Sequence, residues 1–371
     1  PLRLAYLTKP DIAYYRRVLK GIAHFVKHQG GWDLRVLRVV SNEGFEQLER
    51  GHYDGVILGT RADRTERALQ LRIPAVSVSN TDPGLPFPQV VTDDVKAGRI
   101  VAMHLMNKGY RHFAFCGGPH VFSEQRCAGF TAAIIESLGE QFAPVRIAPS
   151  PRGSRKTLSG LPTPLGLMTA TDAIGSDAIR VCRELGRRIP EDVAIVGVDD
   201  DEFYSELTDP PLSSVSQQVE QIGYRAAECL SLLLNGEKIP PVTLIPPGPL
   251  AIRLSSRGLV VTDELVAQAM QMMEENLAKG VSIKSVIDVL GVSRRLLEMR
   301  FRAALGQTPG HELSRLKIEL AQNLLATTSL PLKQIAKLSG FGKQARLSQA
   351  FRHFTGQAPI DYRKQYAIHQ L

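Results

Sequence analysis

The chain has 371 residues, of which 43% are hydrophobic and 22% charged. This predicts a globular protein of two or three domains, and no apolar run approaches the roughly 18 residues that a membrane helix requires. The net charge of +8 is concentrated at one end, since thirteen Lys and Arg accompany only four Asp and Glu from Gly291 onward. A local basic excess of this kind is typical of a domain that binds a polyanion such as DNA.

The N-terminus and the cysteines indicate a reducing compartment. The first residues, PLRLAYLTKP, reach charge too soon for a secretory signal, which needs roughly 7–15 apolar residues, and they predict a β-strand instead. The cysteines are far apart, with no CxxC motif and no Cys/His cluster, so thiols are expected rather than disulfides or a metal site. They are Cys116, Cys127, Cys182 and Cys229. We therefore expect a cytoplasmic protein with no metal, no other cofactor and no membrane partner.

Short apolar runs alternate with amphipathic segments over the first 255 residues. The runs are LRLAYL, WDLRVLRVV, DGVILG, AVSVS, FAFCGG, LGLMTA, VAIVGVDD and VTLIPP, and each predicts a strand buried on both faces. Between them, segments such as YYRRVLKGIAHFVKHQG and KAGRIVAMHLMNKG have apolar residues at helical spacing. This alternation predicts parallel sheets covered by helices on both faces, and the length suffices for two such sheets.

Charged residues cluster where the predicted strands end. Arg126 follows FCGG, Asp172 follows LGLMTA, and Asp199 ends VAIVGVD. Ligands bind beyond the C-terminal ends of parallel strands, so these side chains converge if the two sheets face each other. Carboxylates and a guanidinium suit the hydroxyls of a sugar, although from the residues alone Arg126 and Asp199 can equally be structural. Three further acids are better explained as a helix cap or as turn residues: Asp93, Asp200 and Asp201.

The pattern changes after Arg257. The stretch SSRGLVVTDE, from Ser255, is short and polar enough to join two domains. Beyond it no strand pattern appears, and the first of several short helices has Asp263 placed to cap it and Gly280 to end it. We therefore divide the chain into a two-lobed α/β domain over 1–255, a linker over 256–262 and an all-α domain over 263–371.

A nine-residue motif occurs twice near the C-terminus, as FRAALGQTP and, fifty residues later, as FRHFTGQAP. The sequences before the two copies also align. Each copy predicts a short helix (284–290; 333–338), a turn containing glycine (Gly291; Gly340), and a second amphipathic helix that ends in the motif. This is the helix-turn-helix arrangement, in which the second helix lies in the major groove of DNA.

The outward faces of the two second helices carry side chains that can read DNA. Helical spacing directs Leu297 and Phe301 inward in the first copy, and Leu347 and Phe351 in the second. The outward residues include arginine, which pairs with guanine, and glutamine, which pairs with adenine. Any one of these residues, considered alone, is better explained as part of a solvated helix face. Two copies of the pattern within a basic segment instead favour contact with DNA. The candidates are Arg294, Arg295, Met299, Lys343, Gln344, Arg346, Ser348 and Gln349.

The C-terminal segment also has a Gly-Phe turn, a Phe-Arg pair, a glycine, a proline and a Tyr-Arg pair. These stand at Gly340-Phe341, Phe351-Arg352, Gly356, Pro359 and Tyr362-Arg363. With this signature the segment resembles the AraC-type DNA-binding domain. The resemblance implies that a long helix, here His311 to Thr328, joins the two motifs, and that outward residues of both second helices contact bases or phosphates. At Gly342 the chain departs from many relatives, which have a polar residue there.

Motifs of a second family lie between Val90 and about Glu237. They are DDVKAG, RCAGF, TATD, IPEDVAIVGVDDDEF and DPPLSSVSQQVEQIGYRAAECL. This stretch resembles the effector domain of LacI/GalR-type repressors and the periplasmic sugar-binding proteins. The resemblance implies that Arg126 and Asp199 hydrogen-bond the effector and that Asp172, or the residue before it, lines the cleft.

It also implies that the loop from Lys9 to Tyr15 closes over the ligand. We therefore add Asp11, Tyr14 and Tyr15 to the candidate ligand residues, with a tyrosine ring as an apolar platform for a sugar. Between FAPVRIAPS and LPTPLGLMTA the chain has only a polar stretch where the family usually has a full helix, so no cleft residue is assigned there.

An AraC-type reader placed after a LacI-type sensor resembles the xylose-responsive transcription activators. That resemblance implies a sugar-responsive regulator that activates pentose (xylose) genes, binds promoter DNA as a homodimer and works with RNA polymerase. The candidate dimer surface is the helix from Tyr14 to His28.

Three alternatives remain for the function. The same architecture can respond to another small ligand, such as a hexose. A sugar-binding protein without DNA function would lack the basic helical segment. An enzyme is disfavoured because GxGxxG and GxxxxGK[ST] are absent after the first strand, GxSxG and HExxH are absent altogether, and no residue pair suggests a nucleophile with its base.

Overall fold

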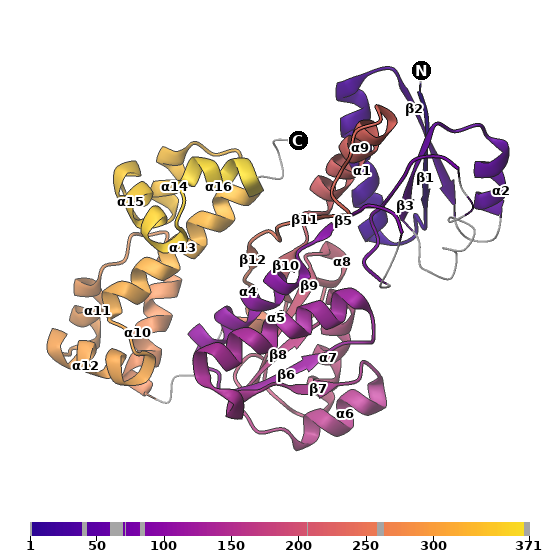
Figure 1. Cartoon of the computed structure of the whole chain (residues 1–371). Coiled ribbons are helices and arrows are strands. Elements are labelled where there is room, and N and C mark those ends of the chain that lie inside the picture. The colour runs from indigo at the N-terminus through magenta and orange to yellow at the C-terminus, as the bar shows by residue number, and fades with distance from the viewer. Residues whose placement is uncertain are drawn as a thin grey trace.

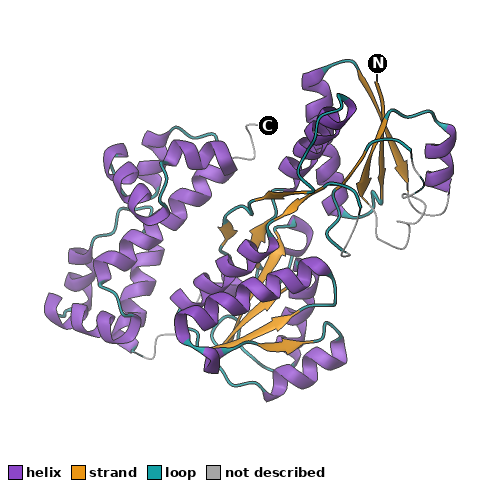
Figure 2. Cartoon of the chain, viewed as in Figure 1, coloured by secondary structure: helices purple, strands orange, loops and turns teal. Residues whose placement is uncertain are grey.

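The computed structural model describes residues 2–38, 43–59, 70, 72–81, 86–205, 207–257 and 263–366. Two α/β lobes are followed by a domain that is helical throughout its described part (Figures 1 and 2). The predicted fold class, a two-lobed sensor followed by an all-α domain with two helix-turn-helix motifs, is confirmed. Within these residues no helix is long and apolar enough to cross a membrane, and no cluster of His, Cys, Asp and Glu could hold a metal ion.

Lobe 1 is built on a six-stranded parallel sheet in the order β11-β5-β4-β3-β1-β2. Its strands are β1 (Leu2–Thr8), β2 (Trp32–Arg38), β3 (Gly55–Gly59), β4 (Ala75–Ser77), β5 (Gln89–Thr92) and β11 (Val242–Ile245). Helices α1 (Ala13–Gln29) and α9 (Val219–Leu234) lie side by side, while α2 (Glu43–Arg50) lies apart from them (Figure 1). The α1 and α9 backbones touch, since a Cβ at Gly21 would stand 1.9 Å from the Glu220 carbonyl oxygen and one at Gly223 would stand 2.0 Å from that of Val18.

Lobe 2 has a second six-stranded sheet in the order β12-β10-β9-β8-β6-β7. Its strands are β6 (His112–Cys116), β7 (Val145–Ile147), β8 (Leu165–Thr169), β9 (Val193–Asp199), β10 (Ser213–Ser216) and β12 (Leu250–Ala251), of which β12 pairs antiparallel to β10. Alternate residues of the central strands enter two separate apolar clusters. One cluster includes α4 (Asp94–Asn107) and α5 (Val121–Leu138), and the other includes α6 (Pro151–Gly160) and α7 (Asp172–Glu184), so helices cover both faces of the sheet.

The chain passes between the lobes three times, after β5, after β10 and before β12. The short helix α8 (Glu202–Ser205) follows β9, and the 3-10 turns at Glu140–Phe142 and Leu254–Ser256 complete lobe 2. Because the crossings lie at strand ends, the space between the lobes is bordered by the C-terminal ends of both sheets, as the sequence predicts.

Three details differ from the sequence prediction. Strands β2 and β11 are edge strands and largely exposed rather than buried on both faces, because each has a neighbour on one side only. Strands β5, β7, β10 and β12 are missed, since two to four residues, in β10 mostly serine, make no long apolar run. The polar segment after Ser150 is a helix, α6, because the Ser150 side chain caps it and Leu158 is fully buried.

The C-terminal domain consists of two similar helical units joined by a long helix. Its helices are α10 (Glu264–Glu275), α11 (Ile283–Leu290), α12 (Arg294–Leu305), α13 (Pro309–Thr327), α14 (Leu332–Leu338), α15 (Gln344–Thr355) and α16 (Pro359–Tyr366). Asp263 caps α10 by accepting hydrogen bonds from the backbone N–H groups of Leu265 and Val266, as predicted. Helix α13 contributes apolar side chains to the core of each unit, so it joins them rigidly.

The predicted linker begins within lobe 2. Ser255 and Ser256 are fully buried, and the Ser255 hydroxyl donates to the Ile195 carbonyl oxygen at 2.6 Å. Both residues are therefore anchored to the sheet of lobe 2. The following residues, 258–262, lie outside the described part of the chain.

Candidate functional site

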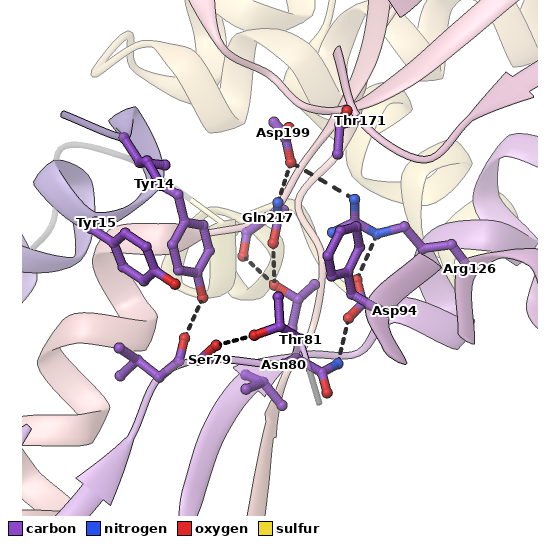
Figure 3. A pocket seen from close by; sticks show the side chains of 15 residues that line it. Tyr14, Tyr15, Ser79, Asn80, Thr81, Asp94, Arg126, Thr171, Asp199 and Gln217 are labelled. Carbon is purple, nitrogen blue, oxygen red and sulfur yellow. Dashed lines mark hydrogen bonds and ion pairs between the residues drawn. The ribbon is translucent and has the colours of Figure 1, made fainter. Parts of the chain in front are cut away.

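A cavity of about 250 Å³ lies between the two lobes (Figure 3). It is lined by the C-terminal ends of β5 and β9 and by the loops and N-terminal helical turns that follow β1, β4, β5, β6, β8 and β10. The wall consists of Ile12, Tyr14, Tyr15, Val78, Ser79, Asn80, Thr81, Val91, Thr92, Asp94, Phe122, Arg126, Thr171, Asp199 and Gln217. Both lobes and two of the crossing segments thus contribute to one site.

Arg126 is the centre of the charged wall. Only 2% of its side chain is exposed, and its Nε donates to Asp94 Oδ1 at 2.7 Å. Its Nη1 donates to the Ala170 carbonyl oxygen and lies 3.8 Å from Asp199 Oδ1. The Phe122 ring lies 4.9 Å from the guanidinium carbon. The guanidinium is therefore held in a fixed orientation between two carboxylates.

Side-chain amides complete this network from the other side of the cavity. Asn80, in lobe 1, donates from Nδ2 to Asp94 Oδ2 at 2.8 Å and to Gln125 Oε1 at 2.9 Å. Gln217, on a crossing segment, donates to Asp199 Oδ1 and accepts from the Thr92 hydroxyl. Figure 3 shows these groups pointing toward one another around the cavity.

The lobes also contact each other through one backbone hydrogen bond and one hydrogen bond from a side chain to the backbone. The Phe122 N–H donates to the Asn80 carbonyl oxygen at 3.0 Å, and Arg17 Nη1 donates to the Asp199 carbonyl oxygen at 3.1 Å. These bonds cross from α5 and β9 in lobe 2 to the loop after β4 and to α1 in lobe 1. The cavity is consequently held between lobes that are hydrogen-bonded together.

Two tyrosines form the apolar wall on the lobe 1 side. Tyr14 donates its hydroxyl to the Val78 carbonyl oxygen at 3.0 Å, and its ring meets that of Tyr15 edge-on, with centroids 5.2 Å apart. Burial raises the pKa of Tyr14 well above its usual value, so its hydroxyl stays protonated. Rigid, neutral aromatic rings of this kind offer a surface for the C–H face of a small ligand.

A pair of acids lies at the lobe 2 side. Burial, together with the charge of Asp199, raises the pKa of Asp172 to about 8, and burial raises that of Asp199 to about 6. Asp172 accepts from the Ser214 hydroxyl at 2.5 Å and from the Asp201 N–H at 2.9 Å. Asp199 and Asp200 have φ values of 138° and 49°, left-handed conformations that are costly for non-glycine residues and often mark ligand sites.

The structure brings together four of the six predicted ligand residues, namely Tyr14, Tyr15, Arg126 and Asp199. Asp172 does not line the cavity; its neighbour Thr171 does, while Asp172 is fully buried behind it. Asp11 also lies outside, because it pairs with Arg38 at 3.3 Å and 74% of its side chain is exposed.

Several wall residues were missed by the sequence prediction. Asn80 follows the strand AVSVS in a polar stretch, and that position was its only signal. Asp94 lies in the motif DDVKAG but received no ligand role, and its neighbour Asp93 caps α4 through the Lys96 N–H. Gln217 follows β10, a strand without an apolar run, so only its place in the motif DPPLSSVSQQVEQIGYRAAECL pointed to it.

The second candidate site is the outer surface of α12 and α15. Leu297, Phe301, Leu347 and Phe351 are fully buried, as predicted. The predicted reading residues are exposed, apart from the half-buried Ser348, and all belong to these two helices or their N-terminal caps. They are Arg294, Arg295, Met299, Lys343, Gln344, Arg346, Ser348 and Gln349.

The two helices start differently. The Ser293 side chain caps α12 by accepting from the Leu296 N–H, whereas Lys343 caps α15 without a side-chain hydrogen bond and follows Gly342, whose φ is 72°. On α12, Arg294 pairs with Glu298 at 2.9 Å. No ion pair involves Arg295 within the described part of the chain, which leaves its guanidinium available to a partner.

Comparison with known proteins finds similar domains in both parts of the chain. Residues 102–256 match a periplasmic binding protein-like domain, and residues 286–365 match a helix-turn-helix domain. The xylose operon regulatory protein of Escherichia coli (strain K12) is 28% identical over 383 residues, covering 97% of this chain and 96% of that protein. Its counterpart from Haemophilus influenzae is also 28% identical, covering 97% and 98%.

Solved structures of transcription regulators are also similar to this chain. A xylose-binding transcription activator, xylR, superimposes with a TM-score of 0.62 and 27% identity, covering 98% of both chains. The regulator CelR in complex with cellobiose has a TM-score of 0.57 and 24% identity over 68% of this chain, and therefore supports the fold of the two lobes alone. These similar proteins are transcription regulators rather than enzymes, in agreement with the sequence prediction.

Proposed function

We propose that this sugar-responsive DNA-binding transcription regulator, which joins a periplasmic binding protein-like sensor to an AraC-type helix-turn-helix reader, takes a pentose, xylose, as its effector and activates genes of pentose use. The observation that carries the proposal is the cavity between the lobes, with its hydrogen-bonding groups on one side and two tyrosine rings on the other. Relatives that cover nearly the whole chain are named for xylose.

The chemistry of the cavity suits a small sugar. Its volume of about 250 Å³ is below the roughly 300–1,000 Å³ of pockets for drug-sized ligands, so it fits a monosaccharide. A sugar ring has hydroxyls that both donate and accept and a C–H face that is apolar. Asp199 offers hydrogen-bond acceptors and Arg126 offers donors, while the amides of Asn80 and Gln217 offer both kinds of group. Tyr14 and Tyr15 supply an apolar surface for the C–H face of the sugar.

Ligand binding favours the closed arrangement of the lobes. Asn80 and the tyrosines belong to lobe 1, whereas Arg126 and Asp199 belong to lobe 2, so one sugar can bond to both only when the lobes are together. A ligand shifts a conformational equilibrium by its differential affinity for the two states, and this site has that property.

The DNA side of the proposal rests on α12 and α15. Their outward residues provide guanidinium, amide and hydroxyl groups for base edges and lysine for phosphate. One chain carries two reading units and covers one half-site. We infer that two chains bind direct repeats as a homodimer through lobe 1, with RNA polymerase recruited beside them, in the cytoplasm where the promoter lies. Helix α1 packs against α9 of its own chain, so its outward face is the part offered to a partner.

Calorimetry with a panel of pentoses, hexoses and nucleobases tests the effector. We expect xylose to bind most tightly and Asp199→Asn to weaken it by about 1–3 kcal/mol, because buried hydroxyls lose a charged partner. Asp11→Asn is the matched control and should bind like the wild type, since Asp11 lies outside the cavity. Preference for a hexose would reassign the effector, and binding of no sugar would refute the proposal.

Gel shifts with promoter DNA at two salt concentrations test the reader. Neutralisation of several phosphates predicts a steep loss of affinity as salt rises. Scattering measurements on a DNA with two half-sites should show two bound chains whose separation changes with sugar. A protein that stays monomeric on that DNA, with a shape that ignores saturating sugar, would contradict the dimer mechanism while leaving both binding sites intact.

A further inference from the structure

A buried ion pair connects the sensor to the reader. Lys108 stands at the C-terminal end of α4 in lobe 2, and only 2% of its side chain is exposed. Its ammonium lies 3.2 Å from Glu274 Oε1 on α10, the first helix of the reader, and donates to the Arg257 carbonyl oxygen at 3.3 Å. A lysine is rarely buried this completely unless it is paired, so this contact holds the two domains together.

A second contact lies one turn earlier on the same helix. His104 Nε2 is 2.9 Å from the Ser256 hydroxyl, which also bonds to the Ser213 hydroxyl at 2.8 Å. Burial, reinforced by the charge of Lys108, lowers the pKa of His104 well below its usual value, so the ring is neutral. The C-terminal turn of α4 is thereby attached both to the segment that leads into the reader and, through Lys108, to the reader itself.

The opposite end of α4 forms part of the effector cavity. Asp94, the first residue of the helix, bonds to Arg126 and to Asn80 of lobe 1. The 14 residues of α4 span about 21 Å at 1.5 Å per residue. One continuous helix therefore connects a wall of the cavity to the surface that holds the reader.

Helix α4 has little freedom to bend because it packs backbone to backbone against α5. A Cβ at Gly98 would stand 2.1 Å from the Arg126 carbonyl oxygen, and one at Gly129 would stand 1.9 Å from that of Val95. Since Arg126 belongs to α5, the two helices carry both members of the Arg126–Asp94 pair and must move as one body. A displacement at the cavity is then passed to Lys108 rather than absorbed along the helix.

The contact orients the reader without covering its DNA surface. Two grooves border the interface, and their reader walls come from α10 and α13 and from the region between Phe354 and Tyr362. All eight predicted reading residues are described, and none of them lines either groove. In Figure 1 the labels of α12 and α15 lie at the outer side of the reader, away from lobe 2.

We propose that Lys108 and Glu274 are positioning residues: they fix the direction of the reading helices relative to the sensor, and α4 transmits to them the rearrangement that an effector causes at Asp94. The second half of this proposal rests on the proposed effector site. Its consequence is that the ion pair controls how strongly sugar affects DNA binding and leaves sugar binding itself unchanged.

The test uses the full chain with Lys108→Met, which removes the ammonium and keeps most of the length of the side chain, and with Glu274→Gln. D-xylose affinity is measured by calorimetry, and DNA affinity by gel shift with and without xylose on a site enriched from a random library. An allosteric ligand typically changes affinity at the other site about 5- to 150-fold. We expect the ratio of DNA affinities with and without xylose to fall to about one in each variant, while xylose affinity stays within about twofold of the wild type. The double variant should lose no more than either single variant, because the two residues act as a pair.

Arg99→Met is the matched control. Arg99 lies on the same helix and pairs with Glu136 of α5 at 2.5 Å, an ion pair within lobe 2; its loss should leave the sugar response intact. A full effect of xylose on DNA affinity in Lys108→Met and Glu274→Gln would overturn the inference. Additive losses of that effect in the double variant would also overturn it. Glu274, at 20% exposure, carries the test if Lys108→Met does not fold.

A readout without sugar separates this inference from the proposed function. Small-angle scattering of the free protein should show a larger radius of gyration for Lys108→Met than for Arg99→Met, because the reader is released from lobe 2. If the wild type binds no xylose, the effector assignment fails while this scattering difference still supports the positioning role. Identical scattering profiles for the two variants would refute the positioning role.

Discussion

Replacing Arg126 by methionine tests whether the cavity is organised around one buried cation. The substitution keeps much of the aliphatic length and removes the guanidinium. It leaves Asp94, which is 2% exposed, without its charged partner and deprives the Ala170 carbonyl oxygen of its donor. Asp199 loses the same cation and keeps Gln217 as a side-chain donor.

The magnitude follows from the burial of both partners. Removing one member of a buried ion pair typically costs about 3–5 kcal/mol, because the remaining charge is left in a poorly solvating environment. Melting temperatures of domains of 150–250 residues fall by about 2–4 °C per kcal/mol, so the sensor should melt roughly 6–20 °C lower. Arg146→Met is the control, because it breaks an exposed ion pair with Glu124, which lies on α5 like Arg126. This variant should change the melting temperature little.

The deficit should depend on pH with a definite sign. Burial already raises the pKa of Asp94 although Arg126 opposes the shift, and without Arg126 the pKa rises further. A folded-state pKa above the unfolded value means that the folded state binds the proton more tightly, so lowering the pH stabilises the variant. Calorimetric melts at pH 8 and pH 5 should therefore show a smaller deficit at pH 5. A variant that melts like the wild type, or whose deficit grows as the pH falls, would refute the reasoning.

Three further outcomes follow from the same structure. Gel shifts on single-base variants of the site should show that Arg295→Ala costs about 1–3 kcal/mol of DNA affinity and weakens base preference at one position, whereas Lys343→Ala lowers the affinity for all sequences alike and lowers the salt slope by about one. Equal losses of affinity across sequences for Arg295→Ala would make Arg295 a phosphate contact. Phe351→Ala removes a fully buried ring from the second reading unit and should destabilise the protein by about 3–5 kcal/mol in urea unfolding; a loss below about 1 kcal/mol would contradict its place in the core. The pKa of Asp172 is raised to about 8, so the folded state binds its proton more tightly than the unfolded state. Stability should therefore fall as the pH rises from about 5 to about 8 and level off above that, and Asp172→Asn should flatten the decline. An unchanged slope in melts across this range would show that Asp172 does not titrate there.

The sequence by itself determined the features that depend on local periodicity. Strand and helix patterns recur within a few residues of each other, so the two sheets, the repeated helical unit and its inward Leu–Phe pairs were all predictable. Capping is local too, which is why Asp263 and Asp93 were placed correctly. Edge exposure of β2 and β11 was not predictable, because it depends on which strand ends up beside them.

Only the tertiary structure decided which polar groups share the cavity and which residues join the domains. Asn80 meets Gln125 across 45 residues, and Thr92 meets Gln217 across 125. A difference of one position places Thr171 on the wall and Asp172 behind it. Lys108 and Glu274 are 166 residues apart and each resembles an ordinary surface charge in the sequence. Their pairing depends on how lobe 2 and the reader pack, and long-range packing leaves no periodic trace in either segment.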